Sequence, residues 1–260
     1  MRRSDFNISI STNFATLKNE VTELALDANG DTINIETPTR IIEVGHPIFE
    51  WNMRKWAGVD PDNGDPLWYL DGKGGETTND WNEAEKSYRG KSALPTFSGG
   101  FALHVDFKGV FLDANLYYAG GHMVFEDWAY YTHMNGLYTT GWYNGVADLS
   151  TSWFQPDDNT DYPRIYHDAD PNFATSTSSR FLFEGDYVRL KDLVLGYNLP
   201  ASVVSKIRFS GIQVYVRGTN MLTWIKDDMM KYDPEVRADG FTNLTTPPIK
   251  SFIFGVNFNF

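Results

Sequence analysis

The stretch FSGGFALHVDFKGVFLDANLYY, residues 97–118, predicts a β-hairpin. In Phe97–Phe107, apolar residues and glycine occupy every second position, and small or polar residues fill most of the positions between them. The same alternation resumes over Val110–Tyr118. Because side chains of a strand point alternately to opposite faces, each half is a strand with one apolar face. Lys108 and Gly109 form a connection short enough for a tight turn.

The same period of two recurs along the rest of the chain, whereas helical periodicity is scarce. The further segments that show it are residues 6–14, 48–59, 183–199, 209–219 and 251–260. Within residues 183–199 the apolar positions change phase, so a β-bulge is predicted near Lys191 and Asp192. The chain is therefore predicted to be all-β, with about seven to eight antiparallel strands.

The connections between these strands fall into two length classes. Residues 60–94, 119–182 and 220–248 are long, whereas residues 108–109 and 200–208 are short. Alternate connections of an antiparallel meander lie at the same end, so the long loops share one end and the turns the other. This arrangement is typical of a transmembrane β-barrel. A soluble β-sandwich has the same strand pattern, and the pattern alone does not separate the two.

Residues 18–46 break this rule, because they are long and would lie at the end of the tight turns. Within them, Leu26–Ile35 around Asn29 and Gly30 predicts a small extra hairpin with a type I′ turn. The strand pattern gives no reason for an insertion at this place.

The composition excludes several classes of protein. Lys and Arg number 22 against 34 Asp and Glu, a net charge of −12, and no basic cluster stands out, so no nucleic-acid partner is expected. Cysteine is absent, which excludes thiolate metal sites and a cysteine nucleophile. No apolar run approaches the roughly 20 residues of a spanning helix. No signal peptide follows Met1, so we expect either a cytosolic protein or one whose first part is missing.

No catalytic or metal site is predicted. The turn Asp60–Asp65 superficially resembles a calcium loop, but Gly64 stands one position early and the distal glutamate is absent. The acidic run Asp157–Asp161 is expected to be a solvated surface. No Gly-x-Ser-x-Gly motif is present, and we expect neither an enzyme nor a cofactor. The histidines, which show no zinc-binding spacing, are His46, His104, His122, His133 and His167.

Aromatic residues are concentrated in the long segment 119–182, where Asn, Asp and Thr lie between them. Flat rings beside short polar side chains suit the binding of a sugar or a peptide. Alternatively, the rings pack the loop against itself or form the aromatic girdle of a barrel. The residues predicted to contact a substrate are Trp128, Tyr138, Trp142, Tyr143 and Trp153.

Three further stretches stand out by their order and spacing. They are KWAGVDP at 55–61, LPTFSGGF at 94–101, and a third that runs from YVRLKD at 187–192 through LGYNLP at 195–200 to VYVRGTNMLTW at 214–224, with YDPEV at 232–236 after it. Together they resemble the C-terminal barrel of SusC/RagA-type TonB-dependent outer-membrane receptors of Bacteroidetes. The similarity covers nearly the whole chain and ends in the aromatic alternation up to Phe260.

The resemblance implies that residues 1–260 are the C-terminal portion of a larger plugged barrel with long extracellular loops. A barrel of about 22 strands at about ten residues each leaves no room in this chain for a plug, which we expect outside it together with the signal peptide. Counting back seven strands from Phe260 would place Met1 on the extracellular side, whereas single-chain barrels have even strand numbers. Asn257 and Asn259 are expected to face the lumen. The residues that resemble a barrel-assembly signal, with side chains toward lipid, are Phe254, Val256, Phe258 and Phe260.

The resemblance also implies a function: an outer-membrane TonB-dependent nutrient transporter that imports oligosaccharides or oligopeptides. The implied partners are a SusD-like surface lipoprotein, outer-membrane lipid, and the TonB complex through the missing N-terminal part. Two alternatives stay open. A soluble carbohydrate-binding β-sandwich or barrel would have a polar outer face on every strand, and a glycan-degrading enzyme would need a convergent pair of carboxylates.

Overall fold

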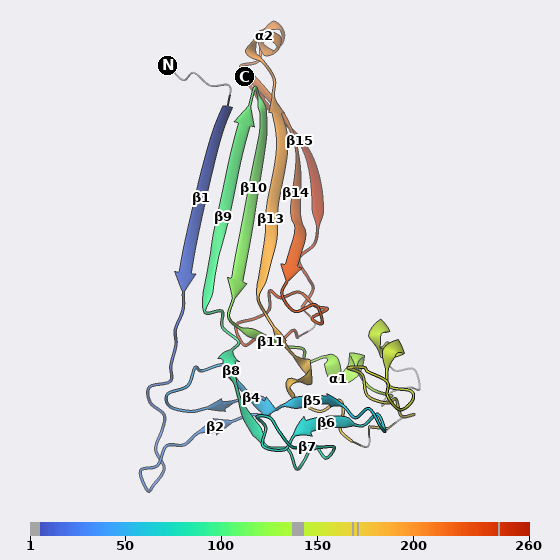
Figure 1. Ribbon diagram of the computed structural model, residues 1–260. Coiled ribbons are helices and arrows are strands. Elements are labelled where there is room, and N and C mark those ends of the chain that lie inside the picture. The colour runs from blue at the N-terminus through green and yellow to red at the C-terminus, as the bar shows by residue number, and fades with distance from the viewer. Residues whose placement is uncertain (1–5, 137–142, 168, 171, 244) are drawn as a thin grey trace.

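One six-stranded antiparallel sheet forms the body of the molecule, and an assembly of loops and short strands lies at one of its ends (Figure 1). The computed structural model describes residues 6–136, 143–167, 169–170, 172–243 and 245–260. Over these residues, no helix has the length and apolar character needed to cross a membrane. The strands are, in spatial order, β1 (Phe6–Thr16), β9 (Phe97–Phe107), β10 (Val110–Gly120), β13 (Tyr187–Asn198), β14 (Gly211–Ile225) and β15 (Ser251–Asn259).

One face of this sheet is apolar across all six strands. Residues directly opposite each other in antiparallel strands lie on the same face. This face is not covered by the described protein, since Phe254 is 84% and Ile10 60% exposed. One row of paired residues across the sheet consists of Ile8, Val105, Leu112, Leu195, Val216 and Phe254.

The opposite face carries polar side chains that bond across the strands. His104 Nδ1 lies 2.6 Å from an Asp113 carboxylate oxygen, and the Asn257 amide donates to the Gln213 side chain over 2.9 Å. This face includes Asn257, as predicted from its position in the strand. In a soluble sandwich the apolar face packs against a second sheet, whereas here the apolar face is the uncovered one.

The tight turns, the start of β1 and the end of β15 lie at one end of the sheet (Figure 1). Between β9 and β10, Lys108 and Gly109 both have positive φ, 50° and 91°, which is the conformation of a type I′ turn. The predicted hairpin is therefore confirmed. The other short connection contains helix α2 (Ala201–Val204) and the 3₁₀ turn η3 (Ser205–Ile207).

The bulge predicted within residues 183–199 is also confirmed, and it lies in β13. Leu116 pairs with Leu190 and Asn115 with Asp192, so Lys191 is the extra residue on β13. The bulge returns the apolar positions on both sides of it to the same face of the sheet.

The prediction of a sheet strand over residues 48–59 is wrong. These residues form β4 (Glu50–Arg54) and β5 (Trp56–Val59), which belong to two small sheets of the loop assembly. Trp51 and Met53 are completely buried there, and Glu50 and Asn52 on the other face are buried too. Alternation indicates an apolar face but not what covers it, and here the cover is the loop assembly.

The main sheet therefore has six strands, and β1 pairs directly with β9. Residues 17–96 form one long connection at the end of the long loops, not at the turn end, so the predicted place of residues 18–46 is wrong. The strand-parity prediction fails with it, because β1 begins at the same end of the sheet as the C-terminus (Figure 1).

The extra hairpin around Gly30 exists, but its turn is not type I′. Leu26 bridges to Thr32, and the Asp27 amide donates to the Asp31 carbonyl over 2.8 Å. Gly30 has a φ of 88° whereas Asn29 is not in the left-handed region, so only one residue has the conformation that a type I′ turn requires twice.

The loop assembly contains short strands and a small core. Its core holds Trp51, Met53, Phe125 and Phe181, and Arg40 stacks over the Trp51 ring at 4.0 Å. Its remaining elements are β2 (Ile35–Glu36), β3 (Ile41–Ile42), β6 (Pro66–Tyr69), β7 (Thr77–Thr78), β8 (Lys86–Ser92), β11 (Met123–Phe125), α1 (Ala129–Thr132), η1 (Ala147–Thr151), η2 (Ser179–Phe181) and β12 (Leu182–Glu184).

The two faces of β15 give a direct test of their surroundings. Arginine at Val256, on the apolar face, is expected to cost about 2 to 4 kcal/mol near the middle of a bilayer, whereas arginine at Asn257 costs little. The measurement is the fraction of the membrane-inserted protein that keeps its compact form on an unheated SDS gel, for Val256→Arg against Asn257→Arg. Equal losses in the two variants would contradict the assignment of the faces.

Candidate functional site

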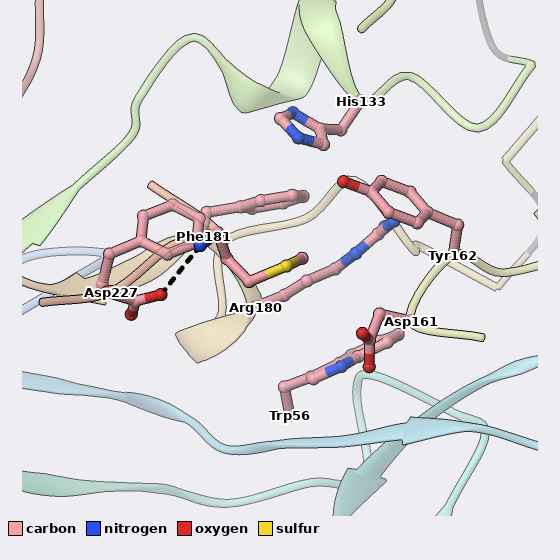
Figure 2. Close-up of a pocket in the computed structure, with 9 residues that line it drawn as sticks. Trp56, His133, Asp161, Tyr162, Arg180, Phe181 and Asp227 are labelled. Atoms are coloured by element: carbon pink, nitrogen blue, oxygen red, sulfur yellow. Dashed lines mark hydrogen bonds between the residues drawn. The ribbon is translucent and has the colours of Figure 1, made fainter. Parts of the chain in front are cut away.

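A cavity of about 220 Å³ lies inside the loop assembly, where segments distant in the sequence meet (Figure 2). Trp56 comes from β5, His133 follows α1, and Arg180 belongs to η2. Its other lining residues are Asp161, Tyr162, Phe181, Phe183, Asp227 and Met229.

A hydrogen bond from a backbone amide to a side chain, together with contacts between rings, holds the walls of this cavity in place. The Trp56 amide donates to the Ser179 hydroxyl over 2.9 Å, which joins β5 to η2. The His133 ring is parallel to the Tyr162 ring, with centroids 6.0 Å apart, and lies 5.6 Å from the Phe181 ring. The rings of Trp56, His133, Tyr162 and Phe181, which line the cavity, therefore come from four separate segments.

Burial shifts the pKa values of the His133 and Arg180 side chains in the cavity. Burial, with the nearby charge of Arg180, lowers the pKa of His133 to about 4, so this imidazole is neutral at pH 7. Burial lowers the pKa of Arg180 to about 10, which leaves the guanidinium charged. Asp161 and Asp227 add carboxylates. The cavity thus combines aromatic surface with fixed charges of both signs.

Glu126 is a buried carboxyl beside this cavity. It accepts a hydrogen bond from the Thr132 hydroxyl over 3.1 Å, and it lies 3.7 Å from His133 Nδ1. Burial raises its pKa to about 7. The carboxyl also lines a neighbouring cavity of about 530 Å³, together with Arg54 and Trp81.

Among the residues predicted to bind substrate, Trp128 and Tyr143 come close together. Tyr131 lies between them, with its ring centroid 4.8 Å from each of the other two rings. Trp128 also lines a separate cavity of about 380 Å³, with Tyr232, Val236 and the Pro247-Pro248 pair among its walls. Tyr138 and Trp142 lie outside the described residues.

Trp153 lies apart from this aromatic group. Its indole N–H donates to the Pro61 carbonyl over 3.0 Å, and its ring covers Gly64, where an added Cβ would come within 2.5 Å of the ring. This packing attaches the aromatic segment to the Asp60–Asp65 turn. Contact of Trp128, Tyr138, Trp142, Tyr143 or Trp153 with a substrate stays a prediction.

The residues that sequence analysis missed are those with no local signal. Trp56 belongs to the KWAGVDP stretch, but that stretch indicated a family and not a cavity, and Arg180 is a single arginine in a serine-rich stretch. Only the packing of distant segments brings them to one cavity.

A cluster of charged residues ties the loop after β14 to the polar face of the sheet. The Arg189 guanidinium, with its side chain only 1% exposed, lies 2.6 Å from Asp233 and 3.1 Å from Glu235. Lys191 pairs with Glu235 as well, and the Tyr187 hydroxyl donates to that carboxylate over 3.0 Å. We call Arg189, Lys191, Asp233 and Glu235 the loop–wall cluster. It joins the YVRLKD and YDPEV stretches, which are far apart in the sequence.

This chain is similar in sequence to TonB-dependent receptors of Formosa agariphila. TonB-dependent receptor P3 is 29% identical over 295 residues, which cover 98% of this chain and 27% of that receptor. TonB-dependent receptor P26 is 27% identical, over 65% of this chain and 17% of the receptor. The chain thus spans about a quarter of the length of P3. No protein-family model matches it.

Solved structures of a transport complex have the same fold. The structure of the RagAB peptide transporter matches with a TM-score of 0.77 and 28% identity, over 99% of this chain and 28% of that chain. The RagAB peptide importer in its closed-closed state matches with a TM-score of 0.79 and 28% identity, over the same shares of both chains.

The resemblance to TonB-dependent receptors is therefore confirmed, and these receptors are proteins of the outer membrane. This chain is similar to receptors of this class over nearly its whole length. Within the class, its structural similarity is to the RagA type.

The loop–wall cluster predicts a loss of stability when its central arginine is replaced. Arg189→Gln leaves two partly buried carboxylates without their central cation, which is expected to cost about 3 to 5 kcal/mol. Hydrogen exchange of residues 226–243 should then increase strongly. Arg217→Gln is the control, because Arg217 pairs with Asp192 but is 47% exposed. Similar exchange in both variants would contradict the anchoring role.

The raised pKa of Glu126 predicts a pH dependence of the loop assembly. An unfolded glutamate ionises near pH 4.5 and folded Glu126 near 7, so its contribution to stability is complete below about pH 4.5 and is lost as the pH rises through 7. The loss corresponds to about 3 kcal/mol at pH 8.

Glu126→Gln should remove this dependence and slow hydrogen exchange of residues 123–136 at pH 8, after correction for intrinsic rates. The exposed Glu76→Gln variant is the control. A pH profile of Glu126→Gln that equals the wild-type profile would show that Glu126 is ionised without cost.

Proposed function

We propose that residues 1–260 form the C-terminal portion of the β-barrel of an outer-membrane TonB-dependent nutrient transporter, which imports oligopeptides or oligosaccharides together with a SusD-like surface lipoprotein. The observation that carries this proposal is the structural match to the RagAB peptide transporter over nearly the entire chain. In the proposal, the plug and the contact with the TonB complex lie outside these residues.

The edges of the sheet support a place in a larger barrel. β1 and β15 are the two edge strands, and each has one side without a described partner strand. In lipid every backbone N–H and C=O needs a partner, so an open edge is costly. Further strands on both sides would pair these groups, and the apolar face of the six strands would then contact lipid.

The polar face and the loops supply the parts that handle a ligand. The loop–wall cluster holds the loop after β14 against the polar face, which faces the lumen in this proposal. The cavity of Figure 2 offers aromatic surface and fixed charges to a ligand at the end of the long loops. These residues would bind and orient the ligand, and no covalent step is required of them.

Cell fractionation and uptake test the proposal together. An antibody to residues 209–260 should detect a polypeptide several times larger than 29.6 kDa in the outer-membrane fraction. Deletion of its gene, or a protonophore, should abolish uptake of fluorescent oligopeptides or oligosaccharides, because import draws on the proton gradient of the inner membrane. A soluble band of 29.6 kDa would contradict the proposal and favour a soluble binding module.

A further inference from the structure

Arg180 is a half-buried cation that has no ion-pair partner among the described residues. Its Nη1 donates to the Ala174 carbonyl over 2.7 Å, and its buried Nη2 makes no hydrogen bond to any residue that the structure describes. Buried donors without a partner are rare in folded proteins. Arg164, another partly buried arginine of the loop assembly, pairs with Asp65 at 3.2 Å. Arg180 therefore retains a hydrogen-bonding capacity that the fold itself does not use.

Three aromatic rings surround this guanidinium. Its central carbon lies 5.1 Å from the Trp56 ring centroid, 5.1 Å from that of Phe181 and 6.0 Å from that of Tyr162. Figure 2 shows the side chain extending through the cavity toward Tyr162. Rings that contact the guanidinium stabilise its charge without using its N–H donors. The donors lie in the guanidinium plane, in the geometry that binds both oxygens of a carboxylate.

The two carboxylates of the cavity differ from Arg180 in their environment. The Asp227 carboxylate accepts hydrogen bonds from the amides of Glu184 and Met229, each over 3.1 Å, so it serves the fold. Asp161 is exposed, and its charge is screened by solvent. The guanidinium, enclosed by rings, acts in a region of lower dielectric, where its attraction for an anion is stronger.

We infer that Arg180 binds a carboxylate group of the transported ligand, with the rings of Trp56 and Tyr162 beside it. This inference rests on the proposed function, because it assigns a ligand to the loops of a transporter. The carboxylate could belong to a uronic acid of an oligosaccharide or to the end of a peptide, and both sources present the same planar anion to the guanidinium.

The test measures binding to the complete receptor, purified in detergent, by isothermal titration calorimetry. The probes form two matched pairs: trigalacturonate with its methyl ester, and a tetrapeptide with its C-terminally amidated form. The wild-type receptor should prefer the carboxylate form within one pair, and that pair identifies the source. Arg180→Gln should weaken binding of this form about tenfold or more and leave its neutral counterpart unchanged.

Two further variants separate recognition from a structural role. Arg180→Lys keeps the charge but not the planar fork, so it should retain part of the preference. Arg164→Gln should retain all of it, because Arg164 already has a carboxylate partner.

The inference is overturned if the wild-type receptor shows no preference for a carboxylate form, if the preference survives in Arg180→Gln, or if that variant loses charged and neutral probes equally. The proposed function fails on a different result, the absence of gene-dependent and protonophore-sensitive uptake. A receptor that transports normally with Arg180→Gln would therefore refute the inference alone.

Discussion

A shift of one residue in the pairing of two strands would turn the apolar side chains of the shifted strand to the polar face of its neighbour. The pairing is fixed by the turn at Lys108 and Gly109, where both residues take left-handed conformations, and by the bulge at Lys191. With this register, the apolar residues of six strands share one face and the polar residues share the other. Everything on the polar face, including the loop–wall cluster, depends on that separation.

The strands of the main sheet could be predicted because their information is local. Period-two alternation identified the segments, and the change of phase within 183–199 located the bulge. Residues 48–59 alternate equally well, but Trp51 and Met53 pack into the core of the loop assembly and not into the sheet. A strand pattern therefore tells which side is apolar, whereas the partner of that side depends on the rest of the fold.

Sequence analysis could predict the aromatic character of a binding site but not which residues form the cavity. An aromatic-rich segment indicated flat binding surfaces, and Tyr162 and Phe181 of this segment line one cavity, but none of the five rings predicted to contact a substrate is among its lining residues. Its charged residue, Arg180, had no recognisable sequence pattern, since its surroundings come from β5 and from the segment around Tyr162. Trp153 has both polar and aromatic neighbours in the sequence, yet its indole N–H donates a hydrogen bond to the Pro61 carbonyl. Long-range packing decides which rings remain available to a ligand.

The loop–wall cluster bears on how such a chain can evolve or be recombined. Arg189 and Lys191 belong to a strand, whereas Asp233 and Glu235 belong to the loop that follows the next strand. A loop exchanged between two relatives would bring its acidic residues to a wall that was selected for other partners. The loop and the strand facing it therefore form one unit of inheritance, and a functional chimaera needs both from the same parent.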